Sequence, residues 1–429
     1  FWGAMSSSRR AVLTGVGLVT PIGLDAASFW QSLSAGRGGV RPVQSFDASA
    51  LPVRFGGEVV GFDARNYLEK KDRKRLKVMV RTIQFAVAAA RLAADDAGLG
   101  GAPPDPERFG VVFGAGTIPG ELEDLGPAAQ ASLGDTPGRI DLTKWGERGI
   151  PLMPPMWMLN HVPNMIACHV SVLHDARGPN NTISQTDVGG LLALGEALRA
   201  VRRGRADLFL AGGADAKINP ITMARQCLFS PLSRRNDAPD RASRPFDLGR
   251  DGMVLGEGGG VLVLEELEHA RRRGAKIYAE VVGFGSAFDR GLTGAGVARA
   301  AVGALREAGI GPDALDHVNA QGYGTPVADA VEARGLQELF GEDRPALPVF
   351  APKSYFGNAG AASGPVELAA SLLAQANGLL PATLNYEQPD PQCPVNVAAE
   401  VRPVTRPYFL KLGFTELGQC AAVVCRKWE

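Results

Sequence analysis

The sequence predicts an α/β protein that contains two copies of one strand–helix unit. Apolar, β-branched runs typical of buried strands alternate with segments of helical periodicity. A similar order of elements recurs after Lys276, with a break near residues 255–275, and the first strand of each copy ends in glycine. The composition is that of a globular protein, with 45% hydrophobic and 21% charged residues.

The first half is expected to open with a strand at 10–17 (RAVLTGVG), followed by a helix at 26–35. A second helix is expected at 78–98, because apolar residues there recur at helical spacing. The remaining predicted elements are strand 108–114, strand 181–184 with a short turn into helix 188–203, and strands 207–212 and 253–264. Residues 117–150, rich in Gly, Pro and Asp, predict an excursion or loop, and residues 230–250 predict a long surface or gating loop.

The second half repeats this pattern. Its predicted elements are strand 277–283, helix 296–309, strand 316–320, helix 328–339, strand 349–351, helix 365–376, and strands 408–411 and 421–426. We therefore expect two halves, at residues 9–265 and 266–429. Residues 1–8 lack the charged and apolar regions of a secretion signal, and we expect them to be a non-native or disordered extension.

Charge and cysteine content exclude several classes of function. The 45 basic and 45 acidic side chains cancel, which disfavours binding to a nucleic-acid backbone. No apolar run approaches the ~18–20 residues that a membrane helix needs. The five cysteines show no CxxC spacing, so neither a disulfide framework nor a zinc site is indicated. We expect a cytoplasmic protein that has no cofactor and no metal.

Four segments carry a resemblance to a known family: 9–23 (RRAVLTGVGLVTPIG), 62–75 (FDARNYLEKKDRKR), 233–247 (SRRNDAPDRASRPFD) and 245–285. They resemble the elongating β-ketoacyl-ACP synthases, the condensing enzymes of fatty acid and polyketide synthesis. The resemblance implies the thiolase fold, a duplicated five-layer αβαβα sandwich that works as a dimer. It also implies acyl and malonyl thioesters on an acyl carrier protein as substrates.

The family's condensing chemistry uses one cysteine and two histidines, and this sequence departs from the family at all three. The resemblance places Asp187 at the cysteine position, within GPNNTISQTDVGG (178–190). Gln321 takes the place of the first histidine in VNAQGYGTP (318–326), and Asn358 that of the second in KSYFGNAGAASG (353–364), which retains Lys353. The glycine-rich turn near the C-terminus also differs, reading GFTELG (413–418). The resemblance further assigns substrate-binding positions to Phe229, Phe414, Thr415 and Glu416.

These replacements limit the chemistry. Asp187 suits a helix N-terminus and could simply cap its helix, as Asp commonly does. As a nucleophile or base it could instead support thioester hydrolysis, because a mixed anhydride is readily destroyed by water. Gln321 and Asn358 cannot exchange a proton near neutral pH, although their amides can donate hydrogen bonds. His317 lies four residues before Gln321, out of register with the family histidine.

We therefore expect a ketosynthase-like protein that has lost condensing activity and resembles the chain-length factor of type II polyketide systems. The predicted partners are an acyl carrier protein and a second subunit, either another copy or a Cys-bearing ketosynthase. The Met-rich segment 151–172 is expected to line the tunnel for the growing chain. The basic clusters 73–77 and 199–205 could dock the carrier, although a solvated helix end explains the second. The alternatives are an acyl-ACP thioester hydrolase, a malonyl-ACP decarboxylase, and a homodimeric carrier-protein binding module.

Overall fold

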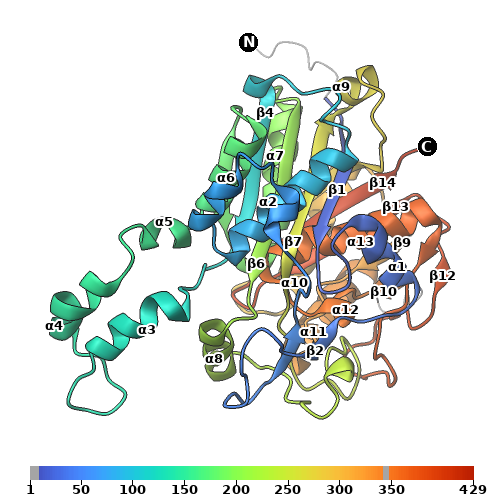
Figure 1. Cartoon of the computed structure of the whole chain (residues 1–429). Coiled ribbons are helices and arrows are strands. Elements are labelled where there is room, and N and C mark those ends of the chain that lie inside the picture. The colour runs from blue at the N-terminus through green and yellow to red at the C-terminus, as the bar shows by residue number, and fades with distance from the viewer. Residues whose placement is uncertain (1–8, 342–346) are drawn as a thin grey trace.

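The protein is described here by a computed structural model that covers residues 9–341 and 347–429. The prediction about residues 1–8 lies outside the described residues. Within them, ten strands form one large sheet in the order β10-β9-β13-β14-β8-β1-β7-β6-β4-β5 (Figure 1). The strands are β1 (Ala11–Val19), β4 (Phe109–Ala115), β5 (Asn180–Ser184), β6 (Leu208–Ala216), β7 (Glu257–Glu266), β8 (Ala279–Phe288), β9 (Leu315–Asn319), β10 (Val349–Phe350), β13 (Tyr408–Phe414) and β14 (Gln419–Lys427).

The strand order reveals a duplicated architecture. The strands before residue 267 run β5-β4-β6-β7-β1, and those after it run β10-β9-β13-β14-β8. Numbered along its own half, each set has the order third, second, fourth, fifth, first. The two sets meet where β1 pairs antiparallel with β8, at Val12–Glu280 and Leu13–Ala279. The structure thus confirms the predicted α/β sandwich with a repeated unit, while the boundary at residues 265 and 266 stays a prediction.

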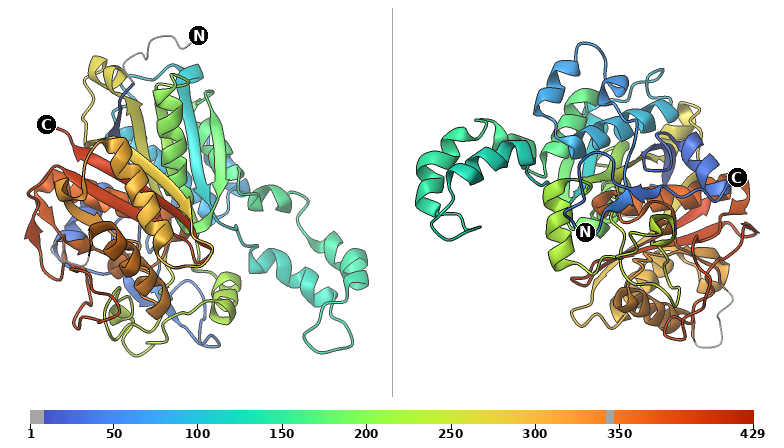
Figure 2. Two further views of the ribbon diagram at one scale, coloured as in Figure 1. Left: turned by 180° about the vertical axis from the view of Figure 1, so that it is seen from behind. Right: turned by 60° about the horizontal axis from the view of Figure 1, so that its bottom comes forward.

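Helices form three layers around the sheet. Helices α2 and α6 pack on the N-terminal strands, α10 packs on the C-terminal strands with α11 beside it, and α7 and α13 pack between the two sets (Figures 1 and 2). Helix α13 is buried along almost its whole length, because it contacts α7 and strands of both halves. The helices are α1 (Ala26–Ser34), α2 (Arg81–Asp96), α6 (Met165–His174), α7 (Gly189–Arg202), α8 (Pro220–Phe229), α9 (Leu267–Arg272), α10 (Ala295–Ala308), α11 (Pro326–Phe340), α12 (Lys353–Phe356) and α13 (Ser363–Asn377).

The region predicted as an excursion at 117–150, together with the first part of the Met-rich segment 151–172, forms a projecting helical arm (Figure 1). It carries α3 (Leu122–Ala131), α4 (Leu142–Lys144) and α5 (Trp157–His161) and extends away from the sheet (Figures 1 and 2). Its exposed apolar side chains are Leu122, Leu133, Ile140, Leu142, Ile150, Leu152, Met156, Met158 and Leu159. Such a surface is typical of a segment that packs against another chain.

Two smaller features complete the fold. Short strands pair as β2 (Val40–Pro42) with β3 (Phe55–Gly57), and as β11 (Leu379–Leu380) with β12 (Arg402–Pro403). The predicted surface loop at 230–250 is in part wrong, because residues 242–247 are buried. There Asp247 accepts hydrogen bonds from the backbone N–H groups of Glu387 and Gln388, which tie the loop to the body. Among the described residues, no helix has the length and apolar character needed to cross a membrane.

Candidate active site

Asp187 lies in the tight turn that joins β5 to α7. Thr186, directly before it, has φ of 42°, a left-handed conformation that a β-branched residue rarely adopts. The turn sits against β4, where a Cβ at Gly114 would lie 2.1 Å from the carbonyl carbon of Gly189. A glycine at this strand position therefore lets the start of α7 approach the sheet. Strain of this kind is common where a fold presents a functional side chain.

Lys217 is the cationic partner of Asp187. Its Nζ lies 3.7 Å from Asp187 Oδ1, and both side chains are largely buried. That oxygen is itself buried and has no hydrogen-bond partner. The expectation that Asp187 caps its helix is therefore wrong: neither the short 3₁₀ turn at Thr186–Val188 nor α7 has a side-chain cap. The carboxylate instead faces the ammonium group that follows β6.

The electrostatics of the site favour an ionised Asp187. Burial raises the pKa of this carboxyl, but the nearby ammonium groups of Lys217 and Lys353 outweigh burial and hold its pKa below the usual range. Asp215 behaves in the opposite way, because burial raises its pKa to about 6 despite the attraction of Lys217. The pKa values of these two neighbouring carboxyl groups are thus shifted in opposite directions, and Asp187 stays ionised to lower pH than Asp215.

Asn358 has a fixed orientation beside this carboxylate. Its Oδ1 accepts hydrogen bonds from the Gly360 N–H (3.2 Å) and the Ser363 hydroxyl (3.0 Å). Its Nδ2 donates to Met253 Sδ at 3.0 Å. With both ends of the amide engaged, Asn358 offers the pocket a hydrogen-bond donor and no exchangeable proton.

Gln321 is fully buried, and neither atom of its side-chain amide has a hydrogen-bond partner. Its backbone is held firmly: the N–H donates to Glu332 at 2.7 Å, and the carbonyl accepts from Lys353 Nζ at 2.9 Å. Lys353 also pairs with Glu367, which is bound on its other side by Lys411. A buried ionic cluster therefore supports the segment that carries Gln321.

The pocket at Asp187 has a volume of about 350 Å³. It is lined by Gly116, Thr117, Pro119, Thr186, Asp187, Asp215, Lys217, Ile221, Thr222, Arg225, Gln226, Ser230, Met253, Tyr323, Asn358, Thr415, Glu416 and Leu417. Of the predicted site residues, the structure thus brings Asp187, Asn358, Thr415 and Glu416 together in one cavity.

The other predicted site residues lie outside this wall. Gln321 and Lys353 belong to the buried cluster described above. Phe414 is buried under Tyr323, whose hydroxyl donates to the Phe414 carbonyl at 2.7 Å. Phe229 stands at the end of α8 with 79% of its surface exposed, so the structure does not bring it into the pocket.

Among the described residues, no thiol and no imidazole lines this pocket. None of the five cysteines or five histidines, all within the described residues, lines this pocket. Burial raises the pKa of the Cys393 and Cys420 thiols to about 12, which leaves both protonated. His317 lies inside β9, bonded to Asp316 at 2.9 Å and to Ser371 at 2.9 Å, and stacks on Phe409. Its position in the core agrees with the predicted register.

The expectation that segment 151–172 lines the tunnel is not met within this single chain, since no residue of the segment lines the pocket. Met156 and Met158 instead lie exposed on the arm, and Met165 packs against the outer face of the N-terminal half. The segment was predicted from composition, which does not reveal that α5 projects away from the body.

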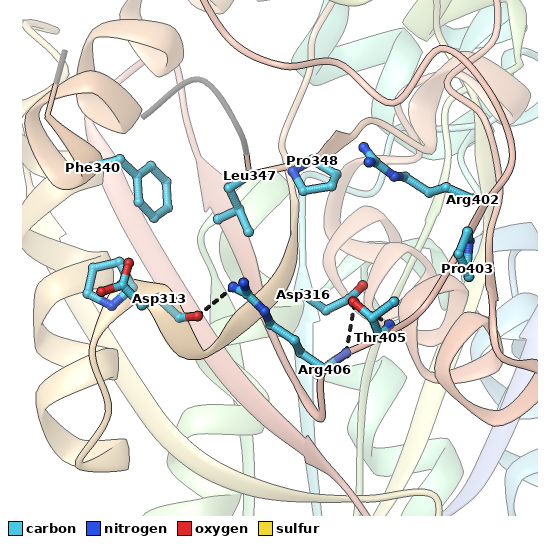
Figure 3. Close-up of a pocket in the computed structure, with 10 residues that line it drawn as sticks. Asp313, Asp316, Phe340, Leu347, Pro348, Arg402, Pro403, Thr405 and Arg406 are labelled. Atoms are coloured by element: carbon cyan, nitrogen blue, oxygen red, sulfur yellow. Dashed lines mark hydrogen bonds between the residues drawn. The ribbon is translucent and has the colours of Figure 1, made fainter. Parts of the chain in front are cut away.

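A second cavity of about 510 Å³ lies at the C-terminal half and contains none of the predicted site residues (Figure 3). Phe340, Leu347 and Pro348 form its apolar wall. Its polar groups bind one another: Arg406 Nη1 donates to the Asp313 carbonyl at 2.5 Å, and the Arg406 N–H donates to Asp316 at 3.1 Å.

Sequence reasoning missed Lys217, Asp215 and Tyr323. Asp215 and Lys217 are separated by one residue and lie beyond the strand predicted at 207–212, which the structure extends to Ala216; a spacing of two residues along a strand places both on the same face. That pattern was available from the sequence, but only the fold brings it to Asp187, which lies about thirty residues earlier.

The duplicated strand order and the strand–turn–helix site define a thiolase-fold protein of the ketosynthase type. Family models agree: residues 8–270 match the beta-ketoacyl synthase N-terminal domain, and residues 278–387 match the beta-ketoacyl synthase C-terminal domain. The chain belongs to the beta-ketoacyl synthase family.

Two relatives show how similar the chain is to individual members of the family. It is 39% identical over 391 residues to a 3-oxoacyl-[acyl-carrier-protein] synthase 2 of Synechocystis sp., covering 90% of each chain. It is 34% identical to the enzyme of the same name from Staphylococcus aureus, covering 99% of this chain and 100% of the relative.

Solved structures agree with the fold. The ishigamide ketosynthase/chain length factor is similar with a TM-score of 0.87 and 29% identity, over 99% of this chain and 100% of that one. A type II polyketide acyl-carrier protein in complex with its ketosynthase bound to the hexaketide is similar with a TM-score of 0.83 and 29% identity, over 99% and 100%. The chain is thus a ketosynthase-like protein, similar to named proteins of fatty acid and of polyketide biosynthesis.

Proposed function

We propose that this chain is a non-condensing, chain-length-factor-like subunit that binds acyl carrier protein thioesters. The observation that carries the proposal is the ionised carboxylate of Asp187, paired with Lys217, at the turn where the family motif has its cysteine. A carboxylate can stabilise an ammonium group there, but it cannot store an acyl group, because acylation of a carboxylate gives a mixed anhydride that water readily hydrolyses.

The two amides support the same conclusion. Condensation requires an oxyanion to be stabilised and malonyl decarboxylation to be promoted, and the family uses imidazoles for these steps. Asn358 retains a donor, and Gln321 is an amide without partners, so neither moves a proton. Residual hydrogen bonding to a thioester carbonyl remains available to the site.

Docking of an acidic carrier protein is assigned to the 3₁₀ helix at Arg73–Val78. Its Arg73, Lys74 and Lys77 are exposed. In the other basic cluster, by contrast, Arg199 and Arg202 both pair with Glu307 within the chain. The test is a binding titration with the carrier protein: the Lys74→Glu variant should weaken binding severalfold, and Arg203→Glu should leave it unchanged.

The helical arm supplies the proposed contact to a second subunit, because its apolar side chains are exposed in the single chain. Co-expression with a Cys-bearing ketosynthase from the same organism should give a stable heterodimer. Elution as a homodimer that ignores such a ketosynthase would favour the homodimeric carrier-protein binding module instead.

One observation favours a second candidate, an acyl-ACP thioester hydrolase. The Asp187 carboxylate has a lowered pKa, and its Oδ1 atom lacks a hydrogen-bond partner. Both properties suit a nucleophile or a base. This candidate predicts free acid released from acyl-ACP by the protein alone, with the release abolished in Asp187→Asn. A malonyl-ACP decarboxylase would instead produce acetyl-ACP, and mass spectrometry of the same reaction separates the two products.

A further inference from the structure

Lys217 occupies a defined place beside the turn that carries Asp187. It follows Ala216, the last residue of β6, and its Nζ lies 3.7 Å from Asp187 Oδ1. The side chain is 12% exposed, so water does little to screen the pair. An ion pair at this separation, with little solvent between the charges, is stronger than a surface pair.

The loop after Asn358 restricts where this lysine can lie. Gly360 has φ of 56°, and a Cβ at that position would lie 2.7 Å from Lys217 Cε and 2.1 Å from Asp215 Oδ2. The Gly360 backbone therefore packs directly on both side chains. Lys217 is confined between this loop and the turn, which limits its freedom to leave Asp187.

We propose that Lys217 is a positioning residue that builds an anion site at position 187, so that the pocket holds a negative charge where relatives hold the acyl-accepting group. This inference rests on the proposed function in one respect only: both assume that residue 187 does not accept the acyl group. It adds a residue, Lys217, that neither the condensing motif nor the carrier-docking surface includes.

The other charged and titratable groups around position 187 come from several elements. They are Asp215 on β6, Lys353 on α12, Tyr323 before α11, and Glu416 between β13 and β14. Asp215 and Glu416 disfavour an anion, and Tyr323 stays protonated because burial raises its pKa well above the usual range. Lys353 is engaged by Glu367 at 2.5 Å, which leaves Lys217 as the cation that faces Asp187 directly.

The test places a reporter anion at the same position. In the Asp187→Cys variant the introduced thiol is alkylated by iodoacetamide as its thiolate, and site-resolved mass spectrometry separates it from the five native cysteines. The alkylation rate is measured as a function of pH for Asp187→Cys by itself. It is then measured for double variants that combine Asp187→Cys with Lys217→Met, Lys217→Arg or Arg225→Met. Arg225 lines the same pocket but is exposed, so it is the matched control.

We expect Lys217→Met to raise the midpoint pH of alkylation by about one unit, which lowers the rate about tenfold below the midpoint. Lys217→Arg should restore the original midpoint, and Arg225→Met should leave it unchanged. An unchanged midpoint in Lys217→Met, or an equal shift in Arg225→Met, would overturn the proposal. If Lys217→Met does not fold, Lys217→Gln gives the same comparison. Condensing activity plays no part in this readout, so it stands or falls separately from the proposed function.

Discussion

The raised pKa of Asp215 makes a quantitative prediction about stability. Burial raises this pKa from 3.8 to about 6, so the folded chain binds more protons than the unfolded chain between these values. Stability must then fall as the pH rises through this window, because the buried carboxyl has to lose its proton. The full effect is about 3 kcal/mol, and about half of it falls between pH 5 and pH 8.

Asp215→Asn removes the titration while keeping the shape of the side chain. We therefore expect the free energy of unfolding of the variant, relative to the native chain, to rise by about 1.4 kcal/mol between pH 5 and pH 8. Urea unfolding followed by circular dichroism at both pH values measures this difference.

The matched control is Asp247→Asn. Burial raises the pKa of Asp247, but bonds from the Gln388 and Glu387 N–H groups and from Arg244 outweigh it and hold the pKa low. This carboxyl is ionised at both pH values, so its replacement should cost the same at pH 5 and pH 8. The reasoning fails if Asp215→Asn shows no pH-dependent gain, or if Asp247→Asn shows an equal one.

Three further predictions concern the loop, the arm and the buried histidine. Gly360→Ala should destabilise the chain by about 1–3 kcal/mol in urea unfolding, because the new Cβ meets Lys217 and Asp215; Gly309→Ala, at a similar positive φ with open space around it, should cost less. Leu142→Ser on the arm should change stability by less than about 0.5 kcal/mol, since 82% of the residue is exposed, yet sedimentation should reveal weaker subunit assembly. His317→Ala should lower stability by about 2–4 kcal/mol without altering carrier binding, because its ring is fully buried and bonded on both sides.

The sequence was sufficient to predict the regular elements of the sandwich. Strand β4 was expected at 108–114 and runs Phe109–Ala115, and helix α7 was expected at 188–203 and runs Gly189–Arg202. These elements are buried and strongly periodic, so their apolar pattern carries the information. Helix α8 was missed, although Asn219 caps it with a bond to the Thr222 N–H at 2.9 Å and Pro220 follows at the first helical position.

The site was predictable only in part. Asp187 and Asn358 were found from motif positions, and the structure places both on one pocket wall. The capping role considered for Asp187 was wrong. The preference of Asp for helix N-termini is a local property, and it takes no account of charged side chains that distant strands bring close. Lys217 supplies such a charge from the end of β6, and only the packing of β6 beside β4 brings it near the turn. The arm was predicted only as an excursion or loop at 117–150, because a sequence rich in glycine and proline does not reveal its helices α3 and α4.

The proposed absence of condensing activity is tested most directly by incubating the purified chain, without a second ketosynthase, with acyl- and malonyl-ACP and analysing all species by mass spectrometry. With a carboxylate and two amides in place of the thiol and imidazoles, we predict neither a covalent acyl adduct on the chain nor a β-ketoacyl-ACP product. An elongated β-ketoacyl product formed by this chain alone would contradict the account.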